Sequence, residues 1–502
     1  MSNALNFNRI VYFGDSLTDS RVLGELSAQA SFVPLPPGAP YVDQYTNGQV
    51  YADYVPGLLG VEGGESLNYA IGGTQALTDR TLADLLGPLA RPDATAELLG
   101  TRVDLDGQID RFLASDDASG DLSGTAAVVA MGINDFNDVA PDATLEEARA
   151  FGESIANKVV GDSQQLADAG VGTLIFHTMH EVQYNPLRSD SSDEERAIAS
   201  EINIGYNDAL RAGAEALEDQ GVEVIVVDIN ALMEEIRNDL SAFGFQSYTE
   251  SRILGVTGLP TIELNPDALD LPVDQLVFLD GVHPTAETHE IWGVFQAESI
   301  TSNVIIEGQD NDRIKGTNGD DLVLSSSGND RVWLKSGDDI ALLGLGNDKA
   351  FGGRGDDVIG AGSGDDRIFG GKGNDILATN AGKDAAYGGS GDDLLVDGFG
   401  RDLLFGGSGD DVFIWTEDAL YGGTADGSTD LIVGGSGHDT LIIRVEDASD
   451  IDADLGWFGT FFETGLKAFG IEDVVIVEGL ELDAELTDQF DLINQAEMWN
   501  FV

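Results

Sequence analysis

The stretches GGRGDDVIG (352–360) and GGSGDDLLV (388–396) are two units of a nine-residue repeat that begins near residue 308. A glycine stands two residues before the aspartate of each unit, with Asp310 the only exception, and an apolar residue stands two residues after it. The units keep one register, which predicts a stack of Gly-rich turns, each followed by a very short strand. Their aspartates are Asp312, Asp321, Asp330, Asp339, Asp348, Asp357, Asp366, Asp375, Asp384, Asp393, Asp402 and Asp411.

The repeated aspartates are candidate calcium ligands. Carboxylate oxygens and turn carbonyls are the hard oxygen ligands that Ca²⁺ takes. Rows of stacked aspartates repel one another without a cation, so we expect folding of this region to be coupled to calcium binding. The alternative is a metal-free solenoid in which Asp serves only as a turn residue. A displaced second run adds two further candidates, Asp430 and Asp439.

The repeats resemble the RTX family, whose consensus GGxGxDxUx (U being a large apolar residue) they follow over about residues 308–415. This resemblance implies an all-β parallel β-roll with two units per turn and several calcium ions between successive loops. It also implies export by type I secretion machinery that reads an uncleaved C-terminal segment. The final segment here is acidic and ends in Met498, Trp499, Phe501 and Val502, which is similar to such signals.

The composition and the N-terminal sequence indicate which binding partners and which cellular location the protein can have. The formal net charge of −65 disfavours nucleic acid as a partner, and the lack of Cys excludes disulfides and thiolate metal sites. The N-terminus, MSNALNFNRIVYFGDS, has neither the basic region nor the apolar run of a cleavable signal peptide. No stretch approaches 18 uninterrupted apolar residues, so we expect no transmembrane segment. With the implied type I export, the prediction is a secreted, extracellular protein.

Up to about residue 303 the sequence alternates short β-branched runs with amphipathic stretches. We expect strands at 9–13, 126–131, 173–178 and 222–228, and helices within 145–169 and 193–220. This alternation predicts an α/β domain, a parallel sheet covered by helices on both faces. Ligands of such sheets bind beyond the carboxyl ends of the strands, so motifs placed there are candidates for chemistry.

Ser16 follows the first expected strand directly, in FGDSLTD (13–19). We expect its hydroxyl at the carboxyl edge of the sheet, with a following helix pointing its N-terminal amides at a developing oxyanion. Near the end of the same region, FLDGVHPTAETH (278–289) places Asp280 three residues before His283. Imidazole can remove the serine proton, and a carboxylate can fix the tautomer of that imidazole. The alternatives are a plain turn at Ser16 and a capped helix start at Asp280.

Two further clusters suit oxyanion stabilisation. NYAIGGT (68–74) places Gly72 and Gly73 where a backbone N–H could approach a substrate, and AMGIND (130–135) ends a strand with Asn134. A tight loop and an Asx turn are the respective alternatives. His177 and His180 follow the third strand, and we expect them to line a pocket or to serve a structural role, because no zinc-like ligand set accompanies them.

In this order, GDSL, NYAIGGT, GIND and Asp-x-x-His-Pro resemble the blocks of the SGNH, or GDSL, hydrolases over about residues 8–300. YTNGQVYADYV (45–55) is similar to a segment of the lipase and esterase branch, although Gln49 stands where a basic residue is common. The resemblance implies a three-layer fold with Ser16 as nucleophile, His283 as base and Asp280 as its orienting acid. It also implies an oxyanion hole made by the Ser16 amide, the Gly73 amide and the Asn134 side chain.

We expect three regions: a hydrolase domain over 1–303, the β-roll over 304–415, and a second short repeat run with the secretion segment over 416–502. The predicted activity is hydrolysis of carboxylic esters, including lipids, through an acyl-serine intermediate, with calcium needed for the repeats and no cofactor for the chemistry. Phospholipid deacylation or acyl transfer by the same residues is one alternative. A calcium-dependent extracellular binding protein with an inactive α/β domain is the other.

Overall fold

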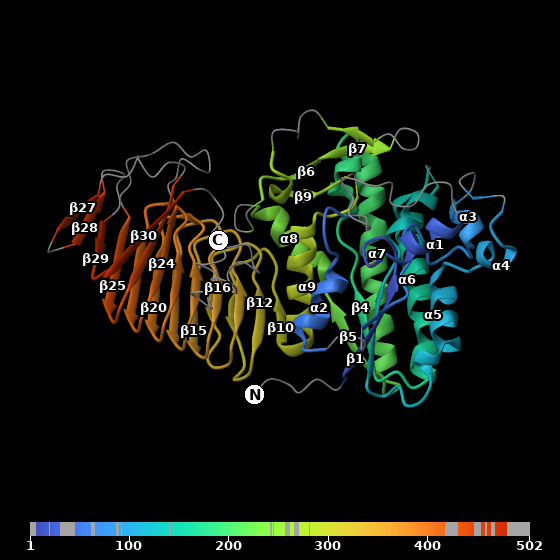
Figure 1. The fold of residues 1–502 in the computed structure, drawn as a ribbon, viewed down its shortest axis with the longest axis horizontal. Coiled ribbons are helices and arrows are strands. Elements are labelled where there is room, and N and C mark those ends of the chain that lie inside the picture. Colours follow the sequence, from blue (N-terminus) through green and yellow to red (C-terminus); the bar gives the residue numbers. More distant parts are fainter. Residues whose placement is uncertain are drawn as a thin grey trace. The chain divides into compact units, whose positions relative to one another are not determined.

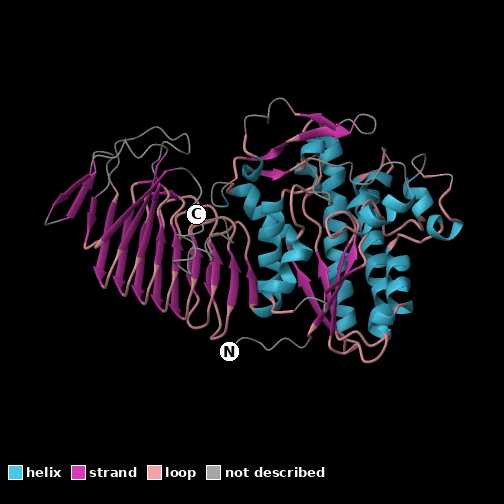
Figure 2. Cartoon of the chain, in the orientation of Figure 1, coloured by secondary structure: helices cyan, strands magenta, loops and turns pink. Residues whose placement is uncertain are grey.

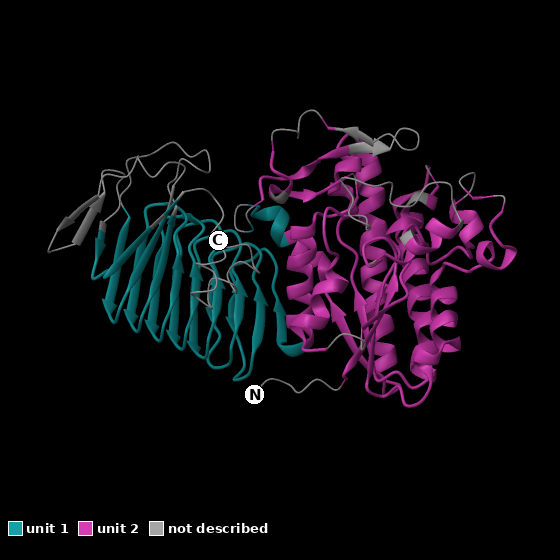
Figure 3. Cartoon of the chain, in the orientation of Figure 1, with its two compact units in different colours: residues 1–3, 235–244, 301–502 teal, residues 4–234, 245–300 magenta. Residues whose placement is uncertain are grey.

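A computed structural model describes the chain in two compact units, which Figure 3 distinguishes by colour. One unit comprises residues 4–234 and 245–300, and the other comprises 1–3, 235–244 and 301–502. The described residues are 7–19, 21–30, 46–61, 66–86, 90–91, 93–140, 142–240, 243, 245–256, 262–265, 271–280, 282–416, 430–445, 453–456, 459–462 and 467–478.

The first unit is built on a parallel sheet with strand order β2-β1-β3-β4-β5. Its strands are β1 (Arg9–Gly14), β2 (Ser66–Asn68), β3 (Thr125–Ala130), β4 (Thr173–His177) and β5 (Glu223–Val227). The four longer strands lie where the β-branched runs predict them. The edge strand β2, three residues long, was not expected from the sequence.

Helices cover both faces of this sheet, so the predicted three-layer α/β fold is confirmed (Figures 1 and 2). One face packs against α5, α6 and α7 through a core that contains Phe13, Phe112 and Tyr206. On the other face Tyr12 contacts Tyr51 of α2, which in turn contacts Trp292 of α9. The helices are α1 (Val22–Ala30), α2 (Tyr51–Leu58), α3 (Leu82–Leu86), α4 (Ala96–Leu99), α5 (Leu105–Ala114), α6 (Leu145–Asp168), α7 (Asp193–Glu218), α8 (Ile229–Asn238) and α9 (Ala286–Thr301).

The two longest helices begin at capping boxes. The hydroxyl of Thr144 accepts the Glu147 amide while the Glu147 carboxylate accepts the Thr144 amide, which fixes the start of α6. Ser192 and Glu195 form the same reciprocal pair at the start of α7. Short pairings complete this unit: β6 (Ser247–Ser251) with β9 (Leu276–Phe278), and β7 (Ile253–Val256) with β8 (Ile262–Leu264).

The second unit contains a parallel β-roll (Figure 1). Its strands up to Thr416 pair with one another at an offset of 18 residues, which is two nine-residue units per turn. Later pairings, beginning with Leu403 beside Leu431, have larger offsets, and the last two pairings of one sheet are antiparallel. Successive units alternate between two sheets, described here in strand order. One sheet is β10 (Asn303–Ile306), β12 (Asp321–Leu324), β14 (Ile340–Leu342), β16 (Val358–Gly360), β18 (Ile376–Ala378), β21 (Leu394–Val396), β24 (Val412–Thr416), β26 (Thr440–Val445) and β30 (Asp473–Glu478). The other is β11 (Arg313–Lys315), β13 (Arg331–Trp333), β15 (Lys349–Arg354), β17 (Arg367–Lys372), β20 (Ala385–Ser390), β23 (Leu403–Ser408), β25 (Leu431–Ser436), β29 (Lys467–Phe469), β28 (Gly459–Phe462) and β27 (Ala453–Gly456). A two-residue pair, β19 (Ala381–Gly382) with β22 (Phe399–Gly400), lies beside them.

The eighth position of the units supplies a row of buried side chains to the core of the roll, as the repeat predicts. Val332, Ile359 and Leu404 are each fully buried at the eighth position of a unit or its equivalent. Glycine is required where coils approach closely: Gly355 has a φ of +115°, and a Cβ there would lie 1.8 Å from the carbonyl oxygen of Gly337. A side chain larger than hydrogen therefore cannot occupy this position of the turn.

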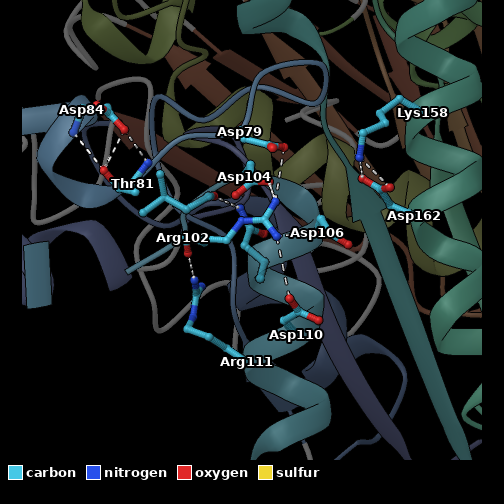
Figure 4. Close-up of polar contacts among 12 residues, drawn as sticks. Asp79, Thr81, Asp84, Arg102, Asp104, Asp106, Asp110, Arg111, Lys158 and Asp162 are labelled. Carbon is cyan, nitrogen blue, oxygen red and sulfur yellow. Dashed lines mark hydrogen bonds and ion pairs between the residues drawn. The ribbon is translucent and has the colours of Figure 1, made fainter. Parts of the chain in front are cut away.

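The segment between Gly73 and α5 is held by an ion-pair cluster around Arg102. Figure 4 shows its guanidinium among four carboxylates, those of Asp79, Asp104, Asp106 and Asp110. The Asp104 side chain is 2 % exposed, so Arg102 neutralises a charge that water does not reach. We expect Arg102→Ala to lower the free energy of unfolding by about 3 kcal/mol, because it leaves that carboxylate buried and unpaired.

Urea denaturation followed by circular dichroism at 222 nm measures this loss. Arg91→Ala is the matched control, because Arg91 pairs with Asp93 at the surface, where both side chains are well exposed. Its expected cost is much smaller, because water screens an exposed ion pair. Equal losses in the two variants would show that the Arg102 cluster contributes no more than a surface pair.

Candidate functional site

Ser16 lies in a turn directly after β1, at the carboxyl end of that strand. Its residue is 6 % exposed, and Thr18 and Asp19 donate their amides to the carbonyl of Asp15 to form the turn. The expectation that a helix follows Ser16 directly is wrong. Helix α1 begins only at Val22, and its first amides donate to the carboxylate of Asp19, which caps the helix locally.

Ser16, His283 and Asp280 form one hydrogen-bonded chain. The Oγ of Ser16 lies 2.9 Å from Nε2 of His283, and Nδ1 of that ring lies 2.8 Å from Oδ2 of Asp280. The second carboxylate oxygen accepts the amides of Val282 and His283, both at 2.8 Å. These bonds fix the carboxylate, which in turn orients the imidazole with one ring nitrogen toward the serine. The structure thus brings Ser16 into hydrogen-bonding distance of His283, which lies 267 residues later in the sequence, with Asp280 behind the ring.

The segment that contains Asn47 and Gly48 supports the loop of His283. Asn47 accepts the backbone N–H of Ala286, the first residue of α9, through its side-chain oxygen at 2.9 Å. A Cβ on Gly48 would lie 2.7 Å from the Cβ of Ala286, so only glycine permits this approach. The Asn-Gly pair of YTNGQVYADYV therefore holds the start of α9 three residues after His283.

Asn134 lies in a 3₁₀ turn (Ile133–Asp138) that follows β3, and its side-chain amide donates to the carbonyl of Thr74 at 2.8 Å. The loop of Gly72 and Gly73 is thereby tied to the turn of Asn134. The Gly72 amide donates to Oδ2 of Asp19 at 2.8 Å, so it is committed to the fold. Gly73 has a φ of +77°, a left-handed conformation that favours glycine.

A cavity of about 170 Å³ opens over these groups. Ser16, His283 and Asn134 line it, whereas Asp280 lies behind the imidazole and Gly73 is not part of the lining. The remaining lining residues are Leu17, Ile133, Phe136, Val182, Asn185, Leu187, Arg188 and Val282. The volume is small beside the roughly 300–1,000 Å³ that is typical of sites for drug-sized ligands.

Part of that lining was not identified from the sequence. Asn185, Leu187 and Arg188 belong to short 3₁₀ turns between β4 and α7, in a stretch without periodic pattern. Arg188 brings a guanidinium to a cavity whose other lining consists of Ser16, His283, two amide side chains and apolar side chains. Only its position after the carboxyl end of β4 could have marked this loop as a candidate.

The three buried histidines outside the triad pack within the protein and serve a structural role. His177 bonds Gln296 at 2.7 Å and lies over Tyr51, and burial lowers its pKa to about 4. His180 is also buried, with its pKa lowered to about 4, and both rings line a small second cavity of about 40 Å³. His289, on α9, has its pKa lowered by burial to about 3. These rings are neutral at pH 7 and lie away from the Ser16 cavity.

Two buried carboxyls adjoin the Ser16 turn. Burial raises the pKa of Asp15 to about 7, while the Leu17 amide opposes the shift by donating to its carboxylate. Burial likewise raises the pKa of Asp135 to about 6, although it accepts the amides of Ala76 and Leu77. Asp135 therefore joins the turn of Asn134 to the chain that follows Gly73.

In the β-roll, the repeated aspartates form a buried ladder. Within it the amide of one aspartate donates to Oδ1 of the aspartate on the next coil, as Asp339 does to Asp357 at 3.1 Å and Asp357 to Asp375 at 2.9 Å. The ladder consists of two such rows. One runs from Asp312 to Asp430, and the other runs from Asp321 to Asp439 and ends where the Asp439 amide donates to the Glu472 carboxylate at 2.8 Å.

The second carboxylate oxygen of these aspartates fits a cation. In the described part of the chain, Oδ2 is buried without a hydrogen-bond partner in Asp330, Asp339, Asp348, Asp357, Asp366, Asp375, Asp384, Asp393, Asp411 and Asp439. A buried, unbonded carboxylate oxygen is costly unless a proton or a cation meets it. Accordingly, burial raises the pKa of Asp357 to about 9 and that of Asp375 to about 7. No three of the described His, Asp and Glu side chains converge on one point, so backbone oxygens must complete any calcium shell.

Comparisons with known proteins agree with both units. The family model of GDSL-like lipases and acylhydrolases matches residues 10–293, and the RTX calcium-binding nonapeptide repeat matches four times, at 308–341, 343–377, 387–414 and 420–441. Comparison with curated proteins gives no match. Among solved structures, an acetylxylan esterase from Geobacillus stearothermophilus is 16 % identical, with 59 % of this chain and 96 % of that chain covered at a TM-score of 0.27. A mutant acetyl-xylooligosaccharide esterase from Geobacillus is 15 % identical over 59 % and 96 %, at a TM-score of 0.28.

Among the described residues, no helix combines the length and the apolar character needed to cross a bilayer. Met498, Trp499, Phe501 and Val502, which the sequence offers as a secretion signal, lie outside the described residues.

Proposed function

Because the chain belongs to the GDSL-like lipase/acylhydrolase family and carries RTX calcium-binding repeats, we propose that it is a secreted serine esterase that cleaves carboxylic esters of short acyl groups. The observation that carries this proposal is the chain of hydrogen bonds from Ser16 through His283 to Asp280 at the wall of a cavity. A serine hydroxyl needs such a base to become nucleophilic.

In the proposed reaction, Ser16 Oγ attacks the ester carbonyl carbon while its proton passes to Nε2 of His283. Asp280 holds the imidazole and stabilises the imidazolium that forms. The bond between the carbonyl carbon and the alkoxide then breaks, the alkoxide takes the proton from His283 and leaves as the alcohol, and an acyl-serine remains at Ser16. Water, deprotonated by His283, attacks this ester and releases the carboxylic acid, and Ser16 recovers its proton.

The amides of Ser16 and Gly73 and the side chain of Asn134 are the proposed donors to the oxyanion. The Gly72 amide already donates to Asp19, so the Gly73 amide is favoured over the Gly72 amide as an oxyanion donor. The Asn134 side-chain amide donates to the carbonyl of Thr74, which holds this group at the wall of the cavity that Ser16 also lines.

We expect Asn134→Ala to lower kcat by about 10²–10³-fold with little change in KM, because the lost donor acts on the transition state. Initial rates over a range of ester concentrations separate the two constants. Asn157→Ala, at an exposed position of α6, is the matched control and should leave both unchanged. A rise in KM alone would place Asn134 in ground-state binding instead.

Cavity size supports short acyl groups. A volume of about 170 Å³ has room for an acetyl or a similarly small group but not for an extended fatty acyl chain. The test measures hydrolysis of p-nitrophenyl esters from acetate to palmitate by the full chain with calcium, together with labelling by a fluorophosphonate. We expect the highest kcat/KM for the short esters and the label on Ser16. Absence of both hydrolysis and label would favour an inactive α/β unit on a calcium-dependent binding protein.

Calcium binding at the aspartate ladder is part of the proposal. The unpartnered Oδ2 atoms and the turn carbonyls are the proposed ligands, with the aspartates of the repeats, including Asp430 and Asp439, contributing one carboxylate each. The bound ions would neutralise stacked carboxylates. Type I export fits the repeats and is tested by expression with a type I apparatus, with and without residues 479–502. Retention of both forms in the cells would contradict it.

A further inference from the structure

Basic side chains form a row on the outer face of the ten-stranded sheet. Register between β11, β13, β15 and β17 places Arg313 beside Arg331, Arg331 beside Lys349, and Lys349 beside Arg367. The three arginines are exposed and Lys349 is half-buried. The row therefore holds one cation per coil, at the spacing of neighbouring strands, about 4.8 Å.

This row is exceptional in a chain with 90 acidic and 25 basic residues. The strands β11, β13, β15, β17, β20, β23 and β25 contain neither Asp nor Glu. Within the described chain, Arg313, Arg331 and Arg367 form no ion pair. Like charges directly opposite one another destabilise a sheet, so an unneutralised row costs free energy that an anionic ligand would recover.

A row of aromatic rings lies next to the cations on the same face. Trp333, Phe351, Phe369, Tyr387 and Phe405 stack in order, with centroids 6.1, 4.9, 4.8 and 5.0 Å apart and planes within 10° of parallel. The Nζ of Lys349 lies 4.9 Å from the centroid of the Phe351 ring, which holds that cation in place. The rings form a rigid, half-buried floor, because each is fixed by its neighbours.

At one end of these rows the surface is hollowed, with a volume of about 880 Å³. Its lining includes Arg313, Lys315, Arg331, Trp333 and Phe351. Cations therefore border the hollow where the row begins, and apolar rings form part of its floor.

We propose that this face binds a linear acidic polysaccharide with one carboxylate per sugar residue. A sugar residue within a chain is about as long as the strand spacing, so successive carboxylates can meet successive cations along the roll. The guanidinium groups suit carboxylates because they offer paired donors in a fixed plane. The ladder aspartates that directly precede these cations would be neutralised by the proposed calcium ions. At physiological ionic strength the Debye length of about 8 Å screens the acidic residues farther away.

Other polyanions fit this face less well. Single-stranded nucleic acid binds through bases stacked on free ring faces, whereas these ring faces are covered by one another. A membrane-binding surface inserts exposed apolar side chains, whereas no ring of this row is among the exposed large hydrophobic residues. A narrow line of charge over a flat floor matches an extended sugar chain.

The test is isothermal titration calorimetry of the full chain, in calcium, with short oligogalacturonates that do not gel. We expect Arg313→Gln with Arg331→Gln to weaken binding by about tenfold. The matched control, Lys383→Gln with Arg401→Gln, removes the same charge from exposed positions outside the row and should change affinity by less than about twofold. Arg313→Lys with Arg331→Lys keeps the charge and should retain binding.

Circular dichroism with calcium shows whether each variant is folded. If Arg313→Gln with Arg331→Gln is not folded, the variant with lysine at both positions still tests the proposal. Hyaluronate, with one carboxylate per two sugars, should bind more weakly than oligogalacturonate. Equal weakening by both glutamine pairs, or no binding by the wild type, would overturn the proposal. The proposal would also be overturned if the chain bound phosphatidylserine vesicles or oligothymidylate but not oligogalacturonate, and if Arg313→Gln with Arg331→Gln abolished that binding.

Discussion

Ser16→Ala is expected to lower kcat/KM for short-chain esters by about 10⁴–10⁶-fold, because no other group supplies the attacking oxygen. The variant removes one oxygen from a turn held by backbone bonds to Asp15, so the fold should be unchanged. Rates on p-nitrophenyl acetate, corrected for the uncatalysed reaction, measure the loss.

Ser154→Ala is the matched control for this variant. Its hydroxyl donates to the Phe151 carbonyl on the exposed side of α6, away from the cavity. It should keep the wild-type rate and the fluorophosphonate label, both of which Ser16→Ala should lose. Residual activity of Ser16→Ala within tenfold of wild type would assign the chemistry to another nucleophile.

Removal of calcium is the second large effect. We expect chelator to unfold the β-roll, because the buried Oδ2 atoms then face one another without a counter-charge. Each independent site contributes about 2.7 kcal/mol at a calcium concentration 100 times its Kd, so several sites exceed the stability of an ordinary domain. Thermal unfolding followed by circular dichroism, with calcium, with magnesium and with chelator, measures the effect.

Neighbouring aspartates provide a matched pair for that experiment. Asp357→Asn keeps the oxygen that accepts the Asp339 amide but removes the buried charge, so it should lower the calcium-dependent melting temperature. Asp356→Asn changes an exposed carboxylate, whose Oδ1 accepts the Asn374 amide, and should have little effect. Equal shifts of the melting temperature in the two variants, or a melting curve that chelator does not change, would contradict calcium binding at the ladder.

The same ladder predicts how acid acts on the calcium-free chain. Burial raises the pKa of Asp339 to about 7 and that of Asp384 to about 9, above the usual 3.8. The folded roll therefore binds more protons than the unfolded chain. The stability that these carboxyl groups contribute to the calcium-free roll should therefore be fully present below about pH 4. It should be lost as the pH rises through 7–9. Melting curves in chelator at stepwise pH measure this trend.

Much of the fold is readable from periodicity. The nine-residue repeat predicts the roll because one apolar side chain per unit has no other way to be buried, and Ile359 lies in such a core. The strands β1, β3, β4 and β5 follow from short β-branched runs between amphipathic helices. Both patterns reflect local chemistry that repeats along the chain.

The details of the site depend on contacts that no local pattern encodes. Ordered motifs predicted Ser16, Asp280 and His283, and the structure places the three side chains within hydrogen-bonding distance. The loop of Asn185, Leu187 and Arg188 was missed because its residues resemble any polar turn. The expectation of a helix directly after Ser16 was wrong because α1 begins only at Val22, six residues after Ser16, where the Asp19 carboxylate accepts its first amides.

The aspartate ladder also gives the β-roll a direction. Each buried amide is capped by a carboxylate from the coil that follows it in the chain, and the last one, that of Asp439, is capped by Glu472. The exposed side chains of the turns run the other way, because the Asn329 amide donates to Asn311 and the Asn374 amide donates to Asp356, both on the preceding coil. Loss of the last coil therefore removes a buried carboxylate acceptor, whereas loss of the first coil removes only an exposed one.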